Sequence, residues 1–319
     1  MKKGYFTPDS NRIDVNFFFK SNGYLVLEDG FTTEEINLLK QESVAICKGE
    51  RGTLADGGSD EKLVIDQFMG EKHPEDIPLY KTDELALQKI LCVHFPHKIS
   101  KPVYEAVHNK NVVDVLTYVV GPNVKCMQSM LFIKASGKPG QAWHQDEDYI
   151  PTRDRSLIGA WVAIDDATID NGCLWVLPES HKPGILWDQT WHGDRNYDCA
   201  DLSVGFPYTD DQAVPVEVKA GSVVFFNGYL LHKSLPNKAP AGTFRRSLVN
   251  HYMSCESFLP WGKVPDDLAV ARHNYKDVMI VAGVDPYAHH GYEDIQKPLL
   301  RPSGEGGCDK WGGTREYTK

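Results

Sequence analysis

The sequence predicts a mainly β protein with flanking helices, whose core is a sandwich or barrel of the jelly-roll or cupin kind. From about residue 124, short β-rich runs alternate with turn residues such as Gly, Pro and Asn-Gly. Many short strands at close spacing are typical of these folds. The preceding third of the chain shows helical patterns instead. A hydrophobic content of 41% is ordinary for a chain that buries a large core.

The N-terminal third is expected to contain one short strand and several helices. Residues 23–28 (GYLVLE) form an apolar run that predicts a strand. Thr32 with Glu35 is the signature of a capping box, and apolar residues then recur at helical spacing as far as residue 47. Residues 81–119 show a helical pattern again, interrupted by two prolines. These elements should flank the β core.

The whole chain, residues 1–319, is interpreted as a single domain with its β core at about 124–254. The strand candidates are SMLFIK, LIGAWVAIDDA, CLWVLP, VPVEVK, SVVFFN, YLLH and RSLVNHYM. Two Asn-Gly pairs, at 171–172 and 227–228, are typical of hairpin turns. The last part, 255–319, is rich in Gly and Pro toward its end and is expected to be an irregular covering segment.

Composition narrows the class of protein and its partners. A net charge of −10 argues against a general nucleic-acid binder. The seven cysteines are scattered, odd in number and never in a CxxC pair, as is typical of reduced thiols in a cytoplasmic protein. Neither a secretory signal nor an apolar run of roughly 18 residues is present. We therefore expect a cytoplasmic protein that neither binds nucleic acid nor associates with membranes.

The stretch AWHQDEDYI contains the first candidate site residues, His144 and Asp146. Side chains at positions i and i+2 of a strand project from the same face. One imidazole and one carboxylate supply two of the three ligands of a 2-His-1-carboxylate site, which holds non-haem Fe(II). His-x-Asp alone is a weak signal, because such a stretch is also typical of a solvated turn.

A second histidine must then come from a distant strand. The candidates are His181, His192, His232 and His251. His232 follows an apolar strand and an apolar step, SVVFFNGYLLH, which places it at the edge of a buried sheet. It is our preferred third ligand.

Two adjacent arginines, Arg245 and Arg246, lie in the strand candidate FRRSLVNHY. A buried arginine is unfavourable unless it meets an anion, and a guanidinium binds a carboxylate with two hydrogen bonds. The distal carboxylate of 2-oxoglutarate would suit it. Strand periodicity leaves open which arginine points inward, and both could also be surface cations on a sheet edge.

Several ordered motifs together resemble the phytanoyl-CoA dioxygenase (PhyH) family of Fe(II)/2-oxoglutarate-dependent oxygenases. They are GYLVLEDGFTTEEI, GPNVKCMQSMLFIK, WHQDEDY, GAWVAIDDATIDNGCLWVLPESHKPG and GSVVFFNGYLLHKS with FRRSLVNHY. The resemblance implies a double-stranded β-helix core, with Fe(II), 2-oxoglutarate and O2 as cofactor and cosubstrates. It implies His144, Asp146 and His232 as the catalytic iron ligands.

The resemblance also assigns the cosubstrate pocket. Arg245 matches the residue that binds the distal carboxylate, with Ser234 beside it. Trp161, Met130 and Lys89 fall where the family lines the pocket, and Gln128 is added because it shares a strand face with Met130.

The implied reaction is hydroxylation of a small molecule with release of succinate and CO2. Two alternatives remain: a non-catalytic cupin-like binding or sensor protein, and the same oxidative chemistry ending in desaturation, epimerisation or cyclisation. Tyr149, Trp191 and His192 are expected to touch the substrate, although a solvated insert explains the latter two nearly as well. The sequence leaves open the substrate, whether it is a CoA thioester or a free metabolite, and the oligomeric state.

Overall fold

The structure is a computed structural model that describes residues 3–51, 64–65, 82–198, 202–257, 278–292 and 298–303. Its α-helices are α1 (Arg12–Asn22), α2 (Thr33–Cys47), α3 (Asp83–Lys89), α4 (Lys101–Val107), α5 (Lys110–Val119) and the single turn α6 (Asp146–Tyr149). Its 3-10 turns are η2 (Pro96–Lys98), η3 (Asp210–Gln212) and η5 (Ala288–His290).

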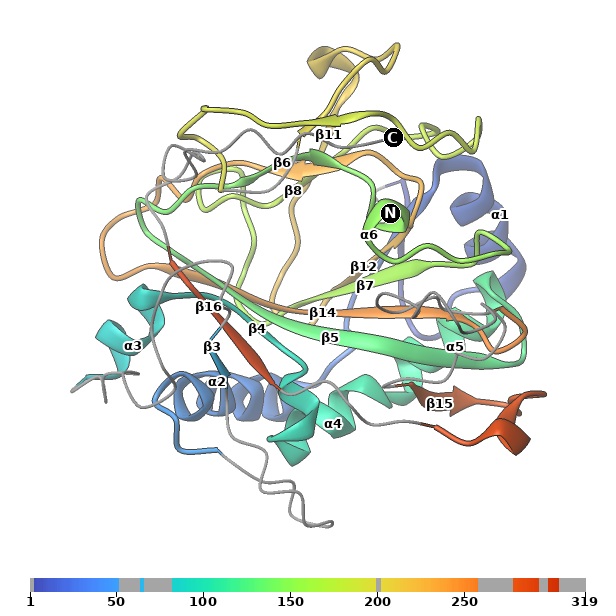
Figure 1. Cartoon of the computed structure of the whole chain (residues 1–319), viewed down its shortest axis with the longest axis horizontal. Coiled ribbons are helices and arrows are strands. Elements are labelled where there is room, and N and C mark those ends of the chain that lie inside the picture. Colours follow the sequence, from blue (N-terminus) through green and yellow to red (C-terminus); the bar gives the residue numbers. More distant parts are fainter. Residues whose placement is uncertain are drawn as a thin grey trace, which may run out of the picture.

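Two large β-sheets organise the chain, as the sequence predicts (Figure 1). The larger contains β1 (Tyr5–Phe6), β2 (Tyr24–Leu27), β12 (Val223–Asn227), β7 (Ile158–Ala163), β14 (Phe244–Ser254), β5 (Val124–Ala135), β4 (Ile90–His94), β16 (Leu299–Pro302) and β3 (Val64–Ile65) in this order, and β15 (Met279–Ala282) pairs with β5. The smaller is β11 (Val214–Val216), β8 (Leu174–Val176), β13 (His232–Ser234) and β6 (Gln141–His144). A separate ribbon joins β9 (Gln189–Thr190) to β10 (Leu202–Ser203).

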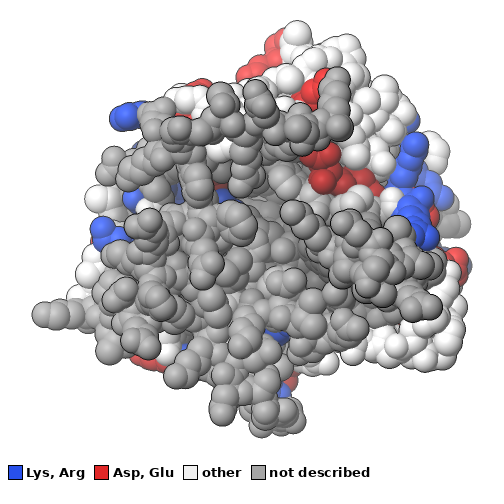
Figure 2. All heavy atoms as spheres, viewed as in Figure 1, with Lys and Arg blue, Asp and Glu red and all other residues white. Residues whose placement is uncertain are grey.

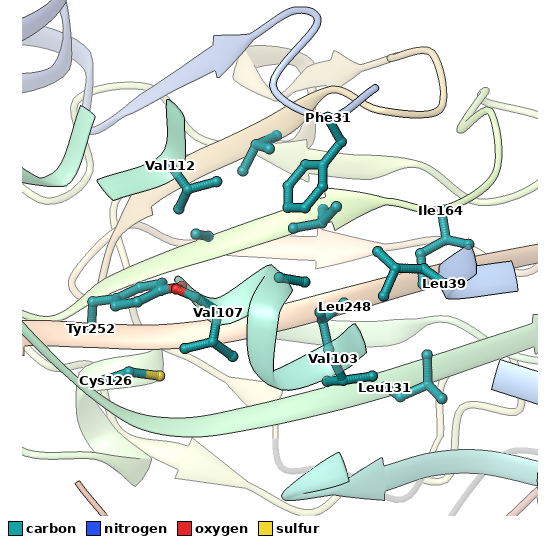
Figure 3. Packing of buried hydrophobic residues seen from close by; sticks show 14 of the residues in the cluster. Phe31, Leu39, Val103, Val107, Val112, Cys126, Leu131, Ile164, Leu248 and Tyr252 are labelled. Carbon is teal, nitrogen blue, oxygen red and sulfur yellow. The ribbon is translucent and has the colours of Figure 1, made fainter. Parts of the chain in front are cut away.

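The two faces of the large sheet meet different partners. In Figure 1, α2, α4 and α5 lie on one side of β5 and β14, and the small sheet lies on the other. Figure 3 shows the helical side, where Val103 and Val107 of α4 meet Leu131, Leu248 and Tyr252 of the sheet. The Tyr252 hydroxyl donates to the backbone carbonyl of Val107 at 2.8 Å. The helices therefore seal one face of the sheet.

The opposite face packs against the small sheet. A second buried cluster there includes Trp161 of β7, Val249 of β14 and Val176 of β8. Apolar side chains from both sheets thus fill the space between them, which is how facing sheets form one core. This is the jelly-roll arrangement of a double-stranded β-helix, and the candidate site lies in this layer.

Local sequence signals explain the first helices and strands. At α2, the Thr32 hydroxyl accepts from the Glu35 backbone N–H, and the Glu35 carboxylate accepts from the Thr32 backbone N–H, so the predicted capping box forms. The predicted strand at 23–28 is β2, which is wholly buried. It pairs with β12 on one side and with β1 on the other.

Three expectations differ from the structure. The predicted helical stretch 81–119 contains a strand, β4, because a short apolar run fits a buried strand as well as a helix. Neither Asn-Gly pair closes a hairpin, because each lies between a strand of the large sheet and a strand of the small sheet. The pair at 171–172 lies between β7 and β8, and the pair at 227–228 lies between β12 and β13. The C-terminal segment contributes β15 and β16 to the large sheet, so its described part is not wholly irregular.

The surface charges and the cysteines can be described for part of the chain. Figure 2 shows basic and acidic side chains on the described part of one face, without an extended basic area. Five cysteines in the described ranges are buried and form no disulfide there (Cys47, Cys92, Cys126, Cys173 and Cys255). Cys199 and Cys308 lie outside those ranges. None of the helices described has the length and apolar character needed to cross a membrane.

Candidate active site

Two histidines face each other across the small sheet. His144 ends β6 and His232 begins β13, and the two are direct cross-strand partners. Each ring is fixed in the same way: Nδ1 of His144 hydrogen-bonds the carbonyl of Ala142 at 2.8 Å, and Nδ1 of His232 the carbonyl of Leu230 at 3.0 Å. A carbonyl only accepts, so Nδ1 carries the proton and Nε2 of each ring presents a lone pair.

Asp146 completes this group. The chain stays extended through Gln145 and then turns into α6, whose first residue is Asp146. Its Oδ1 lies 3.5 Å from Nε2 of His144 and 3.6 Å from Nε2 of His232. All three residues are buried, and their ligand atoms lie within 4.8 Å of one another. Three such donors on one side of a point are the ligand set of a non-haem Fe(II) site.

The charge states suit a divalent metal. Burial, followed by the neighbouring His232, lowers the pKa of His144 to about 3, so its imidazole is neutral. Burial by itself opposes ionisation of Asp146, but the His232 and His251 imidazoles outweigh it and hold the pKa of this carboxyl below its usual range. Neutral imidazoles and an ionised carboxylate are the forms that bind metal.

Arg245 points into the same layer. Its side chain is buried, Nη1 donates to the Ser247 hydroxyl at 3.0 Å, and the guanidinium lies over the Trp161 ring at 5.3 Å. Its Nε has no hydrogen-bond partner in the described part of the chain. Burial lowers the pKa of Arg245 to about 10, which still leaves it a cation at neutral pH. The predicted neighbours Arg245 and Trp161 are thus brought together.

A second buried cation, Lys134, lies directly opposite Arg245 in the pairing of β5 with β14. Its Nζ donates to the Ser234 hydroxyl at 2.8 Å and to the Leu235 carbonyl at 2.7 Å. Burial and the charge of Arg245 hold the pKa of Lys134 well below its usual value. The sequence analysis placed Ser234 here but missed Lys134, whose only signal is a lysine within an apolar strand.

Arg246 has the opposite environment. Its Nε and Nη2 donate to both oxygens of Asp165 at 2.7 and 2.8 Å, and Nη1 reaches the Ser43 hydroxyl of α2. It therefore points to the helical side of the sheet. The question that strand periodicity left open is answered by the structure: Arg245 faces the space between the sheets and Arg246 does not.

The remaining pocket candidates divide into two groups. Gln128 and Met130 are half-buried on β5, and Gln128 Nε2 lies 3.2 Å from Nδ1 of His94. Met130 packs against the cluster between the sheets. Lys89, by contrast, is the exposed last residue of α3, so this structure places its side chain at the surface.

The three substrate candidates also differ in position. Tyr149, 44% exposed, ends α6, and its ring lies edge-on to His144 with centroids 6.3 Å apart. Trp191 and His192 are half-buried in the loop after β9, where His192 lies edge-on to Tyr197. Only Tyr149 contacts one of the three clustered residues.

The other candidate histidines have separate environments. His181 Nε2 hydrogen-bonds the Lys20 carbonyl at 3.1 Å, beside α1. His251, which the sequence offered only as a rival ligand, lies behind Asp146 with its Nε2 2.9 Å from Asp146 Oδ2.

Gln145 connects the site to its surroundings. Its amide donates to the carbonyls of Ile185 and Tyr229 at 2.9 and 2.7 Å and accepts from the Trp187 N–H at 2.9 Å. The residue between His144 and Asp146 therefore points away from them and anchors the start of the insert, residues 185–212, that contains Trp191 and His192.

Comparison with solved structures identifies the fold. The apo form of the non-heme monooxygenase ThoJ superposes with a TM-score of 0.61 at 18% identity, covering 91% of this chain and 88% of that one. The non-heme alpha ketoglutarate dependent epimerase SnoN from nogalamycin biosynthesis gives 0.55 at 15% identity, covering 91% and 95%. The fold is that of the non-haem iron, 2-oxoglutarate-dependent oxygenases.

The sequence comparison is more specific. Residues 19–247 match the family Phytanoyl-CoA dioxygenase (PhyH). A phytanoyl-CoA dioxygenase of Arabidopsis thaliana is 30% identical over 295 residues, which are 84% of this chain and 98% of that protein. The chain belongs to the phytanoyl-CoA dioxygenase family, and it is an oxygenase that depends on iron and 2-oxoglutarate.

Proposed function

We propose that this chain hydroxylates a C–H bond of a small molecule, with iron held by His144, Asp146 and His232. One observation carries the proposal: a buried triad of two imidazoles and a carboxylate faces the same layer as a buried arginine that has no anionic partner among the described residues. Structural ion pairs do not leave an arginine in this state, because a buried charge is stable only when it is paired.

The cosubstrate explains the two buried cations. A protonated Lys134 would lie directly opposite Arg245 on the neighbouring strand, where like charges repel. Burial and this repulsion lower the pKa of Lys134. A dicarboxylate whose distal carboxylate reaches Arg245 relieves this repulsion. Lys134 donates to the Ser234 hydroxyl, which leaves the hydroxyl proton free to point at the same carboxylate.

The protein's part in the reaction is binding, orientation and exclusion of water. When bound, iron and 2-oxoglutarate supply the oxidising power, with 2-oxoglutarate converted to succinate and CO2. The Phe226 ring packs, tilted, against the His232 ring with centroids 4.5 Å apart, and Trp161 and Val249 fill the space nearby. These apolar walls keep the site dry, which strengthens each electrostatic contact in it.

The substrate is proposed to enter beside Tyr149. Of the three predicted substrate residues, Tyr149 is the one placed against His144, while Trp191 and His192 belong to the insert that Gln145 anchors. Once a substrate is found, Tyr149→Ala and Trp191→Ala should raise its KM and leave the uncoupled decarboxylation of 2-oxoglutarate intact. Loss of the uncoupled reaction in both variants would contradict this assignment.

The deciding experiment measures succinate released from 2-oxoglutarate by the Fe(II)-loaded protein across a metabolite panel that includes CoA thioesters and free acids. A substrate that stimulates release, with a product 16 mass units heavier (about the mass of one oxygen atom), supports hydroxylation. A product lighter by two hydrogens, or of unchanged mass, indicates desaturation, cyclisation or epimerisation. Bound iron without any turnover would favour a binding or sensor protein.

A further inference from the structure

His251 makes a contact with the candidate iron ligands that the proposed reaction does not yet use. Its Nε2 lies 2.9 Å from Oδ2 of Asp146, and both side chains are buried. An ionised carboxylate only accepts hydrogen bonds, so Nε2 of His251 is the donor. The other carboxylate oxygen, Oδ1, faces Nε2 of His144 and His232 at 3.5 and 3.6 Å. The two oxygens of Asp146 therefore have separate partners.

We propose that His251 is a positioning residue that restricts Asp146 to binding the metal through Oδ1 alone. This inference rests on the proposed iron site. A carboxylate can bind a metal through one oxygen or through both, and a hydrogen bond to Oδ2 favours the first arrangement. If Asp146 used both oxygens, it would fill one of the coordination positions that 2-oxoglutarate and O2 require.

The backbone around His251 holds the ring in place. His251 lies in the middle of the sheet, where β14 pairs with Gln128 of β5 and with Gly159 of β7. The pairing with β5 shifts just after His251, since Tyr252 pairs with Cys126 and Met127 is left over. Such a bulge re-aims neighbouring side chains and is typical near active sites. Because the backbone at His251 is paired with a strand on each side, the His251 ring does not follow Asp146 if the carboxylate rotates.

Gly159 provides the room that this arrangement needs. A Cβ at this position would lie 2.3 Å from ring atoms of Phe226. Phe226 in turn packs, tilted, against His232. A side chain at Gly159 would therefore require the Phe226 ring, which contacts one ligand, to shift.

The test compares three variants with the wild type. His251→Phe keeps a ring but removes the donor, and His251→Gln retains an amide donor that can reach Oδ2. His97→Phe is the matched control, because His97 is equally buried and hydrogen-bonds one hydroxyl, that of Ser129, away from the triad. Affinities for Mn(II) and Co(II) are measured by titration, and the visible spectrum of the Co(II) form reports its coordination number.

The expected result is a loss of metal affinity of about 10- to 100-fold in His251→Phe, the usual effect of removing a hydrogen bond to a ligand. The Co(II) spectrum of this variant should change, His251→Gln should recover most of both properties, and His97→Phe should match the wild type. Unchanged affinity and spectrum in His251→Phe, or equal losses in His251→Phe and His251→Gln, would overturn the proposal.

Two further measurements keep the outcomes distinct. If His251→Phe does not fold, His251→Asn replaces it, since asparagine is polar but too short to reach Oδ2; affinities equal to those of His251→Gln would then refute the role. His144→Ala tests the iron site itself. Wild-type metal binding by His144→Ala would refute the proposed function, whereas its loss together with wild-type binding by His251→Phe would refute only the role of His251.

Discussion

The two faces of β14 show how one strand serves both catalysis and stability. Arg245, Ser247, Val249 and His251 lie along the face toward the small sheet, where the Arg245 guanidinium lies over the Trp161 ring and His251 contacts Asp146. On the other face, Leu248 and Tyr252 pack under the helices. On the first face, Nε of Arg245 and Nδ1 of His251 lack hydrogen-bond partners among the described residues. On the second, the Arg246 guanidinium and the Tyr252 hydroxyl are hydrogen-bonded, and only the Asn250 amide lacks a described partner.

Adjacent arginines make this contrast sharpest. Arg246 is paired with Asp165 through two hydrogen bonds. Within the described part of the chain, the Arg245 side chain bonds the Ser247 hydroxyl and its Nε has no partner. Residues on the face of β14 toward the small sheet, the inner face, should therefore affect cofactor binding more than stability. Residues on the face toward the helices, the outer face, should affect stability more than cofactor binding. The following predictions test that division.

The largest effect is expected from the triad. His144→Ala and His232→Ala should each abolish metal binding and turnover, because each removes one of three protein ligands. Thermal unfolding without metal should stay near that of the wild type, and added Mn(II) should no longer raise Tm, since only a bound metal stabilises the folded state. His181→Ala, remote from the triad, is the control. Loss of metal binding in His181→Ala with retention in His232→Ala would show that the wrong histidine was chosen.

The arginine pair should separate binding from stability. Arg245→Ala should raise the KM for 2-oxoglutarate by about 10- to 150-fold, since a hydrogen bond to a charged group contributes about 1.5–3 kcal/mol. Arg246→Ala should leave this KM nearly unchanged and lower the free energy of unfolding by about 1–3 kcal/mol, because it removes two side-chain hydrogen bonds from Asp165 and leaves Lys40, at 3.7 Å, as the neighbouring cation. Steady-state kinetics and urea unfolding measure the two quantities. The opposite ranking would mean that the faces of β14 are reversed.

A smaller pair of effects comes from two hydroxyls on opposite faces of β14. Tyr252→Phe removes the donor to the Val107 carbonyl and should lower the free energy of unfolding by about 1–3 kcal/mol, with the KM for 2-oxoglutarate unchanged. Ser247→Ala removes the acceptor for Arg245 and should raise that KM by about 2- to 10-fold, from a net contribution of about 0.5–1.5 kcal/mol. If Tyr252→Phe raised the KM for 2-oxoglutarate and Ser247→Ala did not, the proposed roles of the two faces of β14 would be wrong.

The smallest effect concerns the helices that cover the outer face. Burial alone raises the pKa of Glu42 on α2, but hydrogen bonds from Arg51 and Ser100 outweigh it and hold the pKa below 4.5. A lowered folded-state pKa stabilises the fold above the unfolded-state pKa, and this contribution is lost as pH falls through the folded-state pKa. In Glu42→Gln, the free energy of unfolding should therefore fall less steeply as the pH decreases than in the wild type. Urea titrations from about pH 7 to about pH 3 measure this dependence. Metal affinity at neutral pH should not change.

Much of this architecture can be predicted from local sequence signals. The capping box at Thr32 and the apolar spacing after it specify α2, and the short runs between turn residues specify the strands of the core. The sequence at 90–94 could not be recognised as a strand rather than a helix, because its five apolar or half-buried residues show no clear strand or helix periodicity. The Asn-Gly pairs misled because a turn residue fixes local dihedral angles but not the sheet to which the next strand belongs.

The candidate site shows the same limit. His144, Asp146 and His232 were found because motifs mark them, and the structure brings them together. Lys134 was missed because its role depends on the register between β5 and β14, which the sequence does not display. His251 had a usable signal: it lies six positions after Arg245, so once Arg245 points inward, strand alternation places His251 on the same face.

The pairing of His144 with His232 has a consequence for the order of folding. The two are neighbours across strands but lie 88 positions apart in the chain (232 − 144). Contacts between distant residues form late, because the entropy of closing a long loop opposes them until much of the chain is ordered. The metal should therefore bind only after the small sheet has closed, and metal uptake during refolding should lag behind burial of the tryptophans. Equal rates for both signals in stopped-flow refolding would show that the two histidines meet early, and that the metal itself recruits the strands.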